Sequence, residues 1–553
     1  MKFVAICYYY RILADMESKE KTFKQLKEIT SYYSFGRILG YLRFEMFGNP
    51  QQSIKKSLLS DSERLINSEI ALLAGMWICN VNLSKYWSIE DDTHYLHETK
   101  MLIGNLHSYY KPTINTPFNE QLKEIAFYEG DPGYAWQFTY FAQKKYDNET
   151  FKKYLLEEHN FDVTILLKTY NKIINFMEQQ LKERRSRKQK RIEYISPFNA
   201  FIISPKALHR NFNQLEQGII KSLSIKLGDK QEQTINDIAD RNIFSQYPII
   251  ELPNERGHFI IEPLSLSIAI NETPYYWILD SNKFNSKVIG KIRGDNAENI
   301  VYDIIRKKFS TDYISLNTPI RKTKSSNIIT DIDLLIEYKD IYIVFQVKSK
   351  RLTELSKRGD WDSIEKDFNE AAVNAYNQGC KCIYCLKESS QYYSLKKRGI
   401  NATGESTFFN ICVTLDQYPT ISSMTLYKSY NTETNNIPFM AMSIYDLELI
   451  LSLLSTIEII DYFRFRKECA KNKIYGISEV YYLGAYIIER IYGELLINED
   501  YKISRDCAIF IDYIVDSCRY YYIKVESLKD IDELLYKHPF SLGGGDGCYG
   551  LGR

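Results

Sequence analysis

Helical periodicity dominates the first third of the chain. Apolar residues recur at i, i+3, i+4 and i+7 in SERLINSEIALLAGMWI (62–78) and in FDVTILLKTYNKIINFMEQQL (161–181), which is the spacing of one buried face of a helix. The opening stretch MKFVAICYYYRILADM (1–16) favours a helical core segment over a targeting leader, because tyrosines and Arg11 interrupt its apolar run. We therefore predict a helical region over residues 1–191.

The pattern becomes mixed after this region. Residues 192–285 contain short strand-like pieces such as HFIIEPLSLSIAI (258–270), and they predict a mixed connecting region. Residues 286–430 alternate helix, hairpin, helix and strand, which is typical of an α/β unit. We expect the central sheet of the protein in this part of the chain.

Helical periodicity returns in the last part of the sequence. Residues 431–540 include the amphipathic run SIYDLELILSLLSTIEIIDYFRF, for which Ser443 is the predicted N-cap. Residues 541–553 are rich in glycine and predict a flexible tail. With 553 residues the chain is too long for one hydrophobic core. The predicted class is α/β, with a central mixed sheet flanked by helices and with mainly helical N- and C-terminal regions.

The composition is that of an ordinary globular protein, with 44% hydrophobic residues, 25% charged residues and a formal net charge of +1. This balance excludes a global attraction to nucleic acid or to an anionic membrane, so a nucleic-acid site requires a local concentration of Lys and Arg. No apolar run reaches the roughly 18 residues that span a bilayer. The 10 cysteines show no disulfide-framework spacing, so we expect reduced thiols, a cytoplasmic location and no membrane partner.

Three polar side chains interrupt the hairpin predicted at TDIDLLIEYKDIYIVFQVKSK (330–350). Its two apolar runs flank a turn at residues 339–340. Burying a polar group without a partner costs about 1–3 kcal/mol, and burying a charge costs more, so Asp333, Gln346 and Lys348 need an explanation. Because side chains alternate faces along a strand, the antiparallel register places all three on one face, with Asp333 opposite Gln346.

A further acidic residue lies upstream of the hairpin. RGDNAENIVYDIIRKKF (293–309) predicts a helix that Asp295 caps. Glu298 falls on the apolar face of this helix, with Val301, by the i+3 and i+7 spacing. A carboxylate on a buried stripe needs a partner, and a metal ion held jointly with Asp333 would supply one.

A helix Glu, a strand Asp and a Gln-x-Lys on the next strand resemble the PD-(D/E)xK nuclease superfamily, and the Gln variant is similar to the Mrr-like restriction endonucleases. The resemblance covers about residues 290–390 and implies a nuclease-like mixed sheet. It implies catalytic roles for Glu298, Asp333, Gln346 and Lys348, and a metal set of Glu298, Asp333, Gln346 and Val347.

The resemblance also implies roles for the cofactor and for the elements around the motif. Mg²⁺ is the expected cofactor, with Mn²⁺ as an alternative. Lys348 would orient or activate the attacking water and stabilise the charge on the phosphorus oxygens. The following helix, WDSIEKDFNEAAVNAYNQG (361–379), would pack on the sheet with Asn377 or Gln378 near the site.

A group of cations directly follows the strand that carries Lys348. Its members are Lys350, Arg351, Lys357 and Arg358. Such a cluster can bind a DNA backbone whatever the base sequence. Together with this predicted contact, the resemblance implies a DNA endonuclease with a restriction or anti-phage defence role. An RNase on the same fold stays open, as does a degenerate nuclease fold that serves as a nucleic-acid-binding or scaffold module. A homo-oligomer is also left open.

Three other stretches carry residues with chemical potential. The cysteines of CKCIYCL (380–386) favour small hydrophobes in a central strand over a zinc site, because no second pair of ligands lies nearby. The histidines of DDTHYLHETK (91–100) favour a solvent-facing helix. KERRSRKQKR (182–191) favours a solvated helix end or linker over a phosphate-binding patch.

Overall fold

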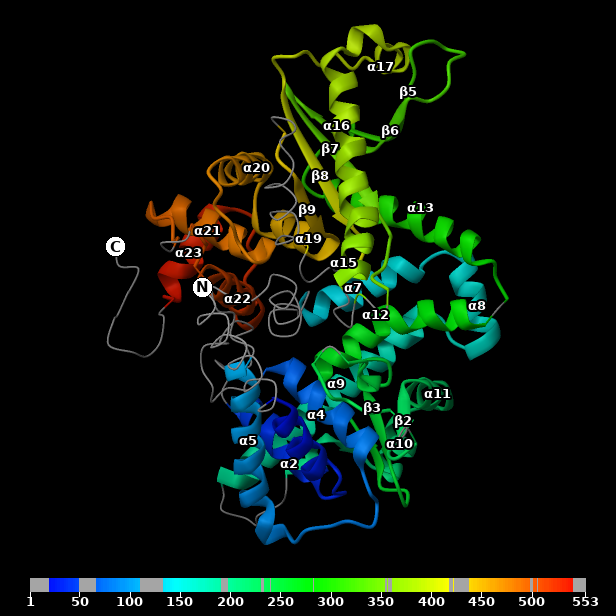
Figure 1. Cartoon of the computed structure of the whole chain (residues 1–553), viewed down its shortest axis with the longest axis vertical. Coiled ribbons are helices and arrows are strands. Elements are labelled where there is room, and N and C mark those ends of the chain that lie inside the picture. Colours follow the sequence, from blue (N-terminus) through cyan, green and yellow to red (C-terminus); the bar gives the residue numbers. More distant parts are fainter. Residues whose placement is uncertain are drawn as a thin grey trace, which may run out of the picture. The chain divides into compact units, whose positions relative to one another are not determined.

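The computed structural model of the chain (Figure 1) describes residues 19–48, 66–109, 133–189, 197–229, 233–238, 240–281, 283–353, 356, 361–416, 421, 437–497, 501–504 and 506–540. These residues form two compact units, of which the first extends to Asn285 and the second begins at Ser286. The predicted opening helix (1–16) and the glycine-rich tail (541–553) lie outside the described residues. Within the described ranges, no helix has the length and apolar character that crossing a membrane requires.

The first unit is mainly helical. Besides a helix over residues 19–30, its α-helices are α2 (Phe35–Gly48), α4 (Asn67–Asn80), α5 (Asp92–Tyr109), α7 (Ala135–Tyr146), α8 (Glu149–His159), α9 (Val163–Gln189), α10 (Pro205–Asn211), α11 (Gln214–Ser222) and α12 (Pro263–Asp280). The helices predicted over 62–78 and 161–181 are present as α4 and α9. Helix α9 continues through most of the basic stretch to Gln189.

A small four-stranded sheet completes the first unit, in the order β1-β4-β3-β2. Its strands are β1 (Ile202–Ile203), β2 (Ser224–Lys226), β3 (Ile249–Leu252) and β4 (Gly257–Phe259), and the 3₁₀ turns are η1 (Ile89–Asp91), η2 (Pro197–Phe201) and η3 (Ile243–Ser245). The strand-like interpretation of residues 258–270 is wrong beyond β4, because α12 begins at Pro263. A proline needs no N–H at the first helical position, and Glu262 caps the helix by accepting from the Ser265 N–H.

The second unit is built on a five-stranded sheet in the order β5-β6-β7-β8-β9. The strands are β5 (Ile314–Ile320), β6 (Thr330–Tyr338), β7 (Ile341–Lys348), β8 (Thr407–Thr414) and β9 (Met440–Ser443). β5, β6 and β7 pair antiparallel, whereas β7, β8 and β9 pair parallel. The predicted mixed α/β class is thereby confirmed for this unit.

Helices cover this sheet and extend beyond it. They are α13 (Ser286–Ile305), α15 (Trp361–Phe368), the π-helix η5 (Asn369–Val373), α16 (Asn374–Lys387), α17 (Tyr393–Arg398), α19 (Ile444–Leu453), α20 (Thr456–Lys471), α21 (Glu479–Tyr492), α22 (Asp506–Tyr520) and α23 (Leu528–Lys537), with 3₁₀ turns η4 (Thr311–Tyr313) and η6 (Ser389–Gln391). Helix α16 packs on β6, β7 and β8 (Figure 1), and α13 contacts β6 and β7. Ser443 is the N-cap of α19, as predicted, and accepts from the Asp446 N–H.

Two local predictions are wrong in the second unit. Helix α13 begins at Ser286, so Asp295 lies inside the helix and does not cap it. The helix starts earlier than predicted because its buried face already includes Ile289. CKCIYCL (380–386) belongs to α16 and not to a strand. Its cysteines lie on the buried face of α16. Burial of this helical face decides the structure of the segment, although the individual residues favour a strand.

Candidate active site

The β6–β7 hairpin turns at residues 339–340, as its sequence predicts. Pairing runs from Tyr338–Ile341 to Leu334–Phe345, so Asp333 and Gln346 are the next residues outward on the two strands. Beyond Leu334 and Phe345 the Asp333 side chain, and not a backbone carbonyl of β6, bonds to β7: its Oδ2 accepts the Val347 N–H at 2.7 Å. The backbone donor is therefore satisfied by a charged side chain.

Asp333 is only 5% exposed. Burial raises the pKa of its carboxyl above the ordinary value, while the charge of Lys348 and the Val347 N–H oppose that rise. The Lys348 Nζ lies 3.9 Å from the Asp333 Oδ2. The carboxylate is thus partly compensated, and a residual preference for a positive partner remains.

Glu298 comes to the same place from α13. Burial raises the pKa of its carboxyl to about 7, the negative charge of Asp333 raises it further in the same direction, and a hydrogen bond from the Asn317 side chain lowers it. The effect of the Asp333 charge on Glu298 shows that the two carboxyl groups lie near each other. Two acidic side chains predicted from the sequence are therefore brought together, with Lys348 close enough to lower the pKa of Glu298 as well.

Asn317 on β5 is a residue that the sequence analysis missed. In the register of β5 with β6, Leu316 pairs with Leu334 and Thr318 with Ile332, which places Asn317 opposite Asp333. That pair is not formed, because Asn317 has a left-handed backbone with φ 45°. The available signal was an asparagine inside the apolar run ISLNTPI, since asparagine is rare in strands and tolerates this conformation.

Gln346 is completely buried. Its Nε2 donates to the Asp331 carbonyl oxygen at 3.0 Å and lies 3.7 Å from the Cys382 Sγ. Its Oε1 has no hydrogen-bond partner among the described residues. A buried carbonyl oxygen without a donor is costly, so this amide is poised to accept a cation or a donor from outside the protein.

Lys348 is held by the helix that follows the hairpin. Its Nζ donates to the Gln378 Oε1 at 3.1 Å, and the Gln378 Nε2 donates to the Asp331 Oδ1 at 2.8 Å. Gln378, predicted as an accessory residue, is therefore part of the cluster, whereas Asn377 is exposed. Helix α16 positions the ammonium group through this amide.

The basic cluster after β7 is engaged with acids where the structure describes it. Lys350 lies 2.7 Å from Glu370 and 3.3 Å from Asp367, and Arg351 lies 3.2 Å from Asp416. Lys357 and Arg358 lie outside the described residues. Contact between these four cations and a DNA backbone stays a prediction.

The donors at this site fit a hard divalent cation. They are two carboxylates, Asp333 and Glu298, and the orphaned Gln346 Oε1, and Mg²⁺ binds through one or two carboxylates while it keeps several waters. Nowhere in the described ranges do three or more His, Cys, Asp or Glu side chains gather as they would around a metal ion. A cation here would therefore be held by fewer acids than a closed protein site supplies.

The predicted solvent-facing helix over 91–100 is present in α5, with its histidines exposed.

No protein-family model, curated protein or solved structure matches the chain. The resemblance to PD-(D/E)xK nucleases therefore stays a prediction from the sequence motif.

Proposed function

We propose that the second unit is a metal-dependent nuclease that hydrolyses phosphodiester bonds, with DNA as its substrate and restriction or anti-phage defence as its role. The observation that carries the proposal is the meeting of a buried carboxylate, Asp333, and a half-buried one, Glu298, with Lys348 at the end of one hairpin. Isolated buried charges are expensive, and like-charged pairs with raised pKa values are typical of functional sites.

The proposed cation, Mg²⁺ or Mn²⁺, would be held by Asp333, Glu298 and the Gln346 Oε1. When bound, it supplies Lewis-acid polarisation of a phosphoryl oxygen and a lowered pKa of water. Val347, predicted as a ligand, contributes its backbone N–H to Asp333 and so fixes the orientation of that carboxylate. Gln346 in place of an acid leaves the site one negative charge weaker.

Lys348 supplies a fixed positive charge. Its partners Gln378 and Asp333 hold the ammonium group before substrate arrives, so little reorganisation is needed when negative charge builds on the phosphorus oxygens. The same ammonium can hydrogen-bond an attacking water. Glu298 must be ionised for cation binding, and its pKa of about 7 makes the activity depend on pH near neutrality.

A second candidate function is a nucleic-acid-binding module without catalysis. The observation that favours it is the small number of ligands: among the described residues no three His, Cys, Asp or Glu side chains gather as they would around a metal ion. The two functions separate in one experiment, in which closed-circular plasmid, linear DNA and RNA are each incubated with and without Mg²⁺. Metal-dependent nicking of the plasmid supports the DNA endonuclease, cleavage of RNA alone supports an RNase, and binding without cleavage supports the module.

A further inference from the structure

The first unit contains a pocket of about 580 Å³ that plays no part in the candidate active site. We call it the arginine pocket; the lining residues used below are Tyr33, Arg37, Phe176, Gln180, Phe198 and Arg256. Its volume is within the range of about 300–1,000 Å³ that small-molecule sites occupy. Among the described residues that line it are two arginines and no Asp or Glu.

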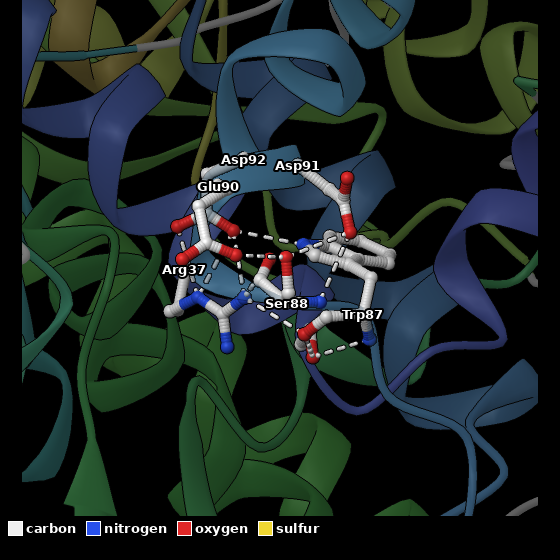
Figure 2. A network of polar contacts seen from close by, with 7 residues as sticks. Arg37, Trp87, Ser88, Glu90, Asp91 and Asp92 are labelled. Carbon is white, nitrogen blue, oxygen red and sulfur yellow. Dashed lines mark hydrogen bonds and ion pairs between the residues drawn. The ribbon is translucent and has the colours of Figure 1, made fainter.

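Arg37 is fixed before any ligand arrives (Figure 2). Its Nε and Nη2 donate to the Asp92 carboxylate at 2.9 and 2.7 Å, and its Nη2 also donates to the carbonyl oxygens of Trp87 and Ser88. Asp92 is 3% exposed and receives a further hydrogen bond from the Trp87 Nε1 at 2.8 Å. The Nη1 takes no part in this network and is turned away from it in Figure 2. Arg37 thus presents one rigid pair of N–H donors.

Two further acids lie on the turn beside Arg37. Glu90 and Asp91 accept from the Ser88 hydroxyl at 2.8 and 3.0 Å, and neither lines the pocket. Asp92 offsets the charge of Arg37 from behind the lining, so Arg256 is the cation of the pocket that no carboxylate among the described residues pairs.

Arg256 supplies an exposed cation to the same pocket. Its guanidinium lies 5.5 Å from the centre of the Tyr33 ring, and its Nη1 is 3.5 Å from the Tyr33 hydroxyl. In the described part of the chain it forms no ion pair with a carboxylate. An arginine held over an aromatic ring through one N–H can still offer its other N–H donors to phosphate or carboxylate.

The rest of the wall is apolar and aromatic. Phe176 projects from α9, and Phe198 from η2. η2 is pressed against α2, because a Cβ on Gly40 would lie 2.7 Å from the Phe198 Cα. Gln180 donates to the Ile202 carbonyl oxygen at 3.2 Å and so holds its amide at the edge of the pocket. Aromatic side chains beside fixed amides suit a flat heterocycle with polar edges.

We propose that the arginine pocket binds a nucleoside phosphate. The phosphate lies between Arg37 Nη1 and Arg256, and the base lies against the aromatic wall with its edge toward Gln180. The nucleotide comes either from the free pool or from the 5′ end of a nucleic-acid strand, since both carry the same phosphate and base. This inference does not rest on the proposed nuclease activity.

The test is isothermal titration calorimetry on the full chain carrying Asp333→Asn, so that strands are not cut. The titrants are the four nucleoside 5′-monophosphates, a 5′-phosphorylated tetranucleotide, adenosine and inorganic phosphate. Arg256→Gln removes the exposed cation, and Arg210→Gln, an exposed arginine on α10 outside the pocket, is the matched control. Circular dichroism and thermal unfolding without ligand check that both variants are folded.

We expect one site per chain for the tightest monophosphate. Adenosine and inorganic phosphate should each bind at least about tenfold more weakly, and Arg256→Gln should weaken nucleotide binding about tenfold or more, as loss of a charge-assisted phosphate contact does. Arg210→Gln should leave the affinity unchanged. A tetranucleotide that binds more tightly than any monophosphate, and loses that binding in Arg256→Gln, assigns the strand end as the source.

Three results would overturn the inference. One is no heat from any monophosphate or from the tetranucleotide at millimolar concentration. Another is inorganic phosphate binding as tightly as the nucleotides, which would make the pocket a plain anion site. The third is nucleotide binding that Arg256→Gln leaves unchanged, which would place the ligand elsewhere on the chain.

Discussion

Asp333 keeps a buried charge because Val347 and Lys348 offset part of its cost. We expect Asp333→Asn to retain an acceptor for the Val347 N–H while it removes the charge. Stability at neutral pH should be unchanged or higher, because the raised pKa means that the ionised form is disfavoured in the folded state. Metal-dependent cleavage should fall by about 10² or more, the scale on which catalytic electrostatic groups act. Urea unfolding and a cleavage assay measure the two effects; a variant that unfolds would make Asp333 a structural residue.

Glu298 predicts a specific pH dependence. Its pKa rises on folding from the ordinary 4.5 to about 7. Below the lower value the carboxyl is protonated in both states; between the two values the unfolded chain ionises first, so stability falls as pH rises; above about 7 the loss is complete. Glu298→Gln should therefore be more stable than the natural chain at pH 8, and this advantage should be much smaller at pH 4.5, where only about half of the unfolded carboxyls are ionised. Urea denaturation of both proteins at the two pH values measures the difference in their free energies of unfolding. A difference that is the same at both pH values would contradict the assigned pKa.

The same carboxyl links cation binding to pH. Since a cation requires ionised Glu298, the increase in melting temperature on adding Mg²⁺ should be larger at pH 8 than at pH 6. Glu298→Gln should lose this difference, whereas Glu405→Gln, an exposed glutamate outside the site, should keep it. A Mg²⁺ effect independent of pH in the natural chain would argue against Glu298 as a ligand.

Asn317 separates backbone strain from side-chain chemistry. Asn317→Gly can adopt the left-handed φ of 45° and removes only the hydrogen bond to Glu298. Asn317→Ala loses the same hydrogen bond and adds strain of about 1–3 kcal/mol. We expect the alanine variant to be the less stable by about that amount, and both variants to shift the pH profile of cleavage upward. Equal stabilities would show that the backbone strain at this position is small.

At the scale of the elements, helix α16 packs closely on the five-stranded sheet and so brings Gln378 to Lys348. A Cβ on Gly379 would lie 2.6 Å from the Cγ of Asn410, a buried residue on β8 whose Nδ2 donates to the Tyr376 carbonyl oxygen. Gly379→Ala should destabilise by about 1–3 kcal/mol, the range for overpacking, and should weaken cleavage because Gln378 is the adjacent residue.

Gly290 in α13 is the matched control for that substitution. A Cβ there meets nothing within 4 Å, and the residue is exposed. Gly290→Ala should stabilise by about 0.5–1 kcal/mol, because alanine loses less backbone entropy in a helix. Unfolding curves of the two variants compare them directly; stabilisation by both would show that helix propensity, and not contact with Asn410, governs the result.

The elements also show how far the sequence could predict the site. The hairpin register followed from alternation and one turn, and it placed Asp333, Gln346 and Lys348 on one face. The helical cysteines of α16 were misread, because a short apolar run has no period of its own and only the preceding helix reveals it. Asn317 was missed because no strand was predicted between the helix and the hairpin, and its role depends on the pairing of β5 with β6. The start of α13 was misplaced because Asp295 resembles a cap when Ile289 is left out of the stripe.

At the scale of the whole molecule, two hydrophobic cores predict two unfolding events. Ile38→Ala removes a fully buried side chain from the first unit, which should cost about 2–5 kcal/mol and lower only one calorimetric transition. Gly290→Ala, in the second unit, should raise only the temperature of the other transition. A single transition that both substitutions move would show that the units unfold as one body.

The nuclease proposal for the second unit is tested most directly by cleavage of closed-circular plasmid with and without Mg²⁺. The comparison uses the natural chain, Asp333→Asn, Lys348→Met, and Lys397→Met as an exposed lysine away from the site. We predict nicking or linearisation by the natural chain and by Lys397→Met only with Mg²⁺, and loss of cleavage in Asp333→Asn and Lys348→Met with DNA binding retained. Absence of cleavage by the natural chain on DNA and RNA alike, or cleavage that survives in Asp333→Asn, would contradict the assignment.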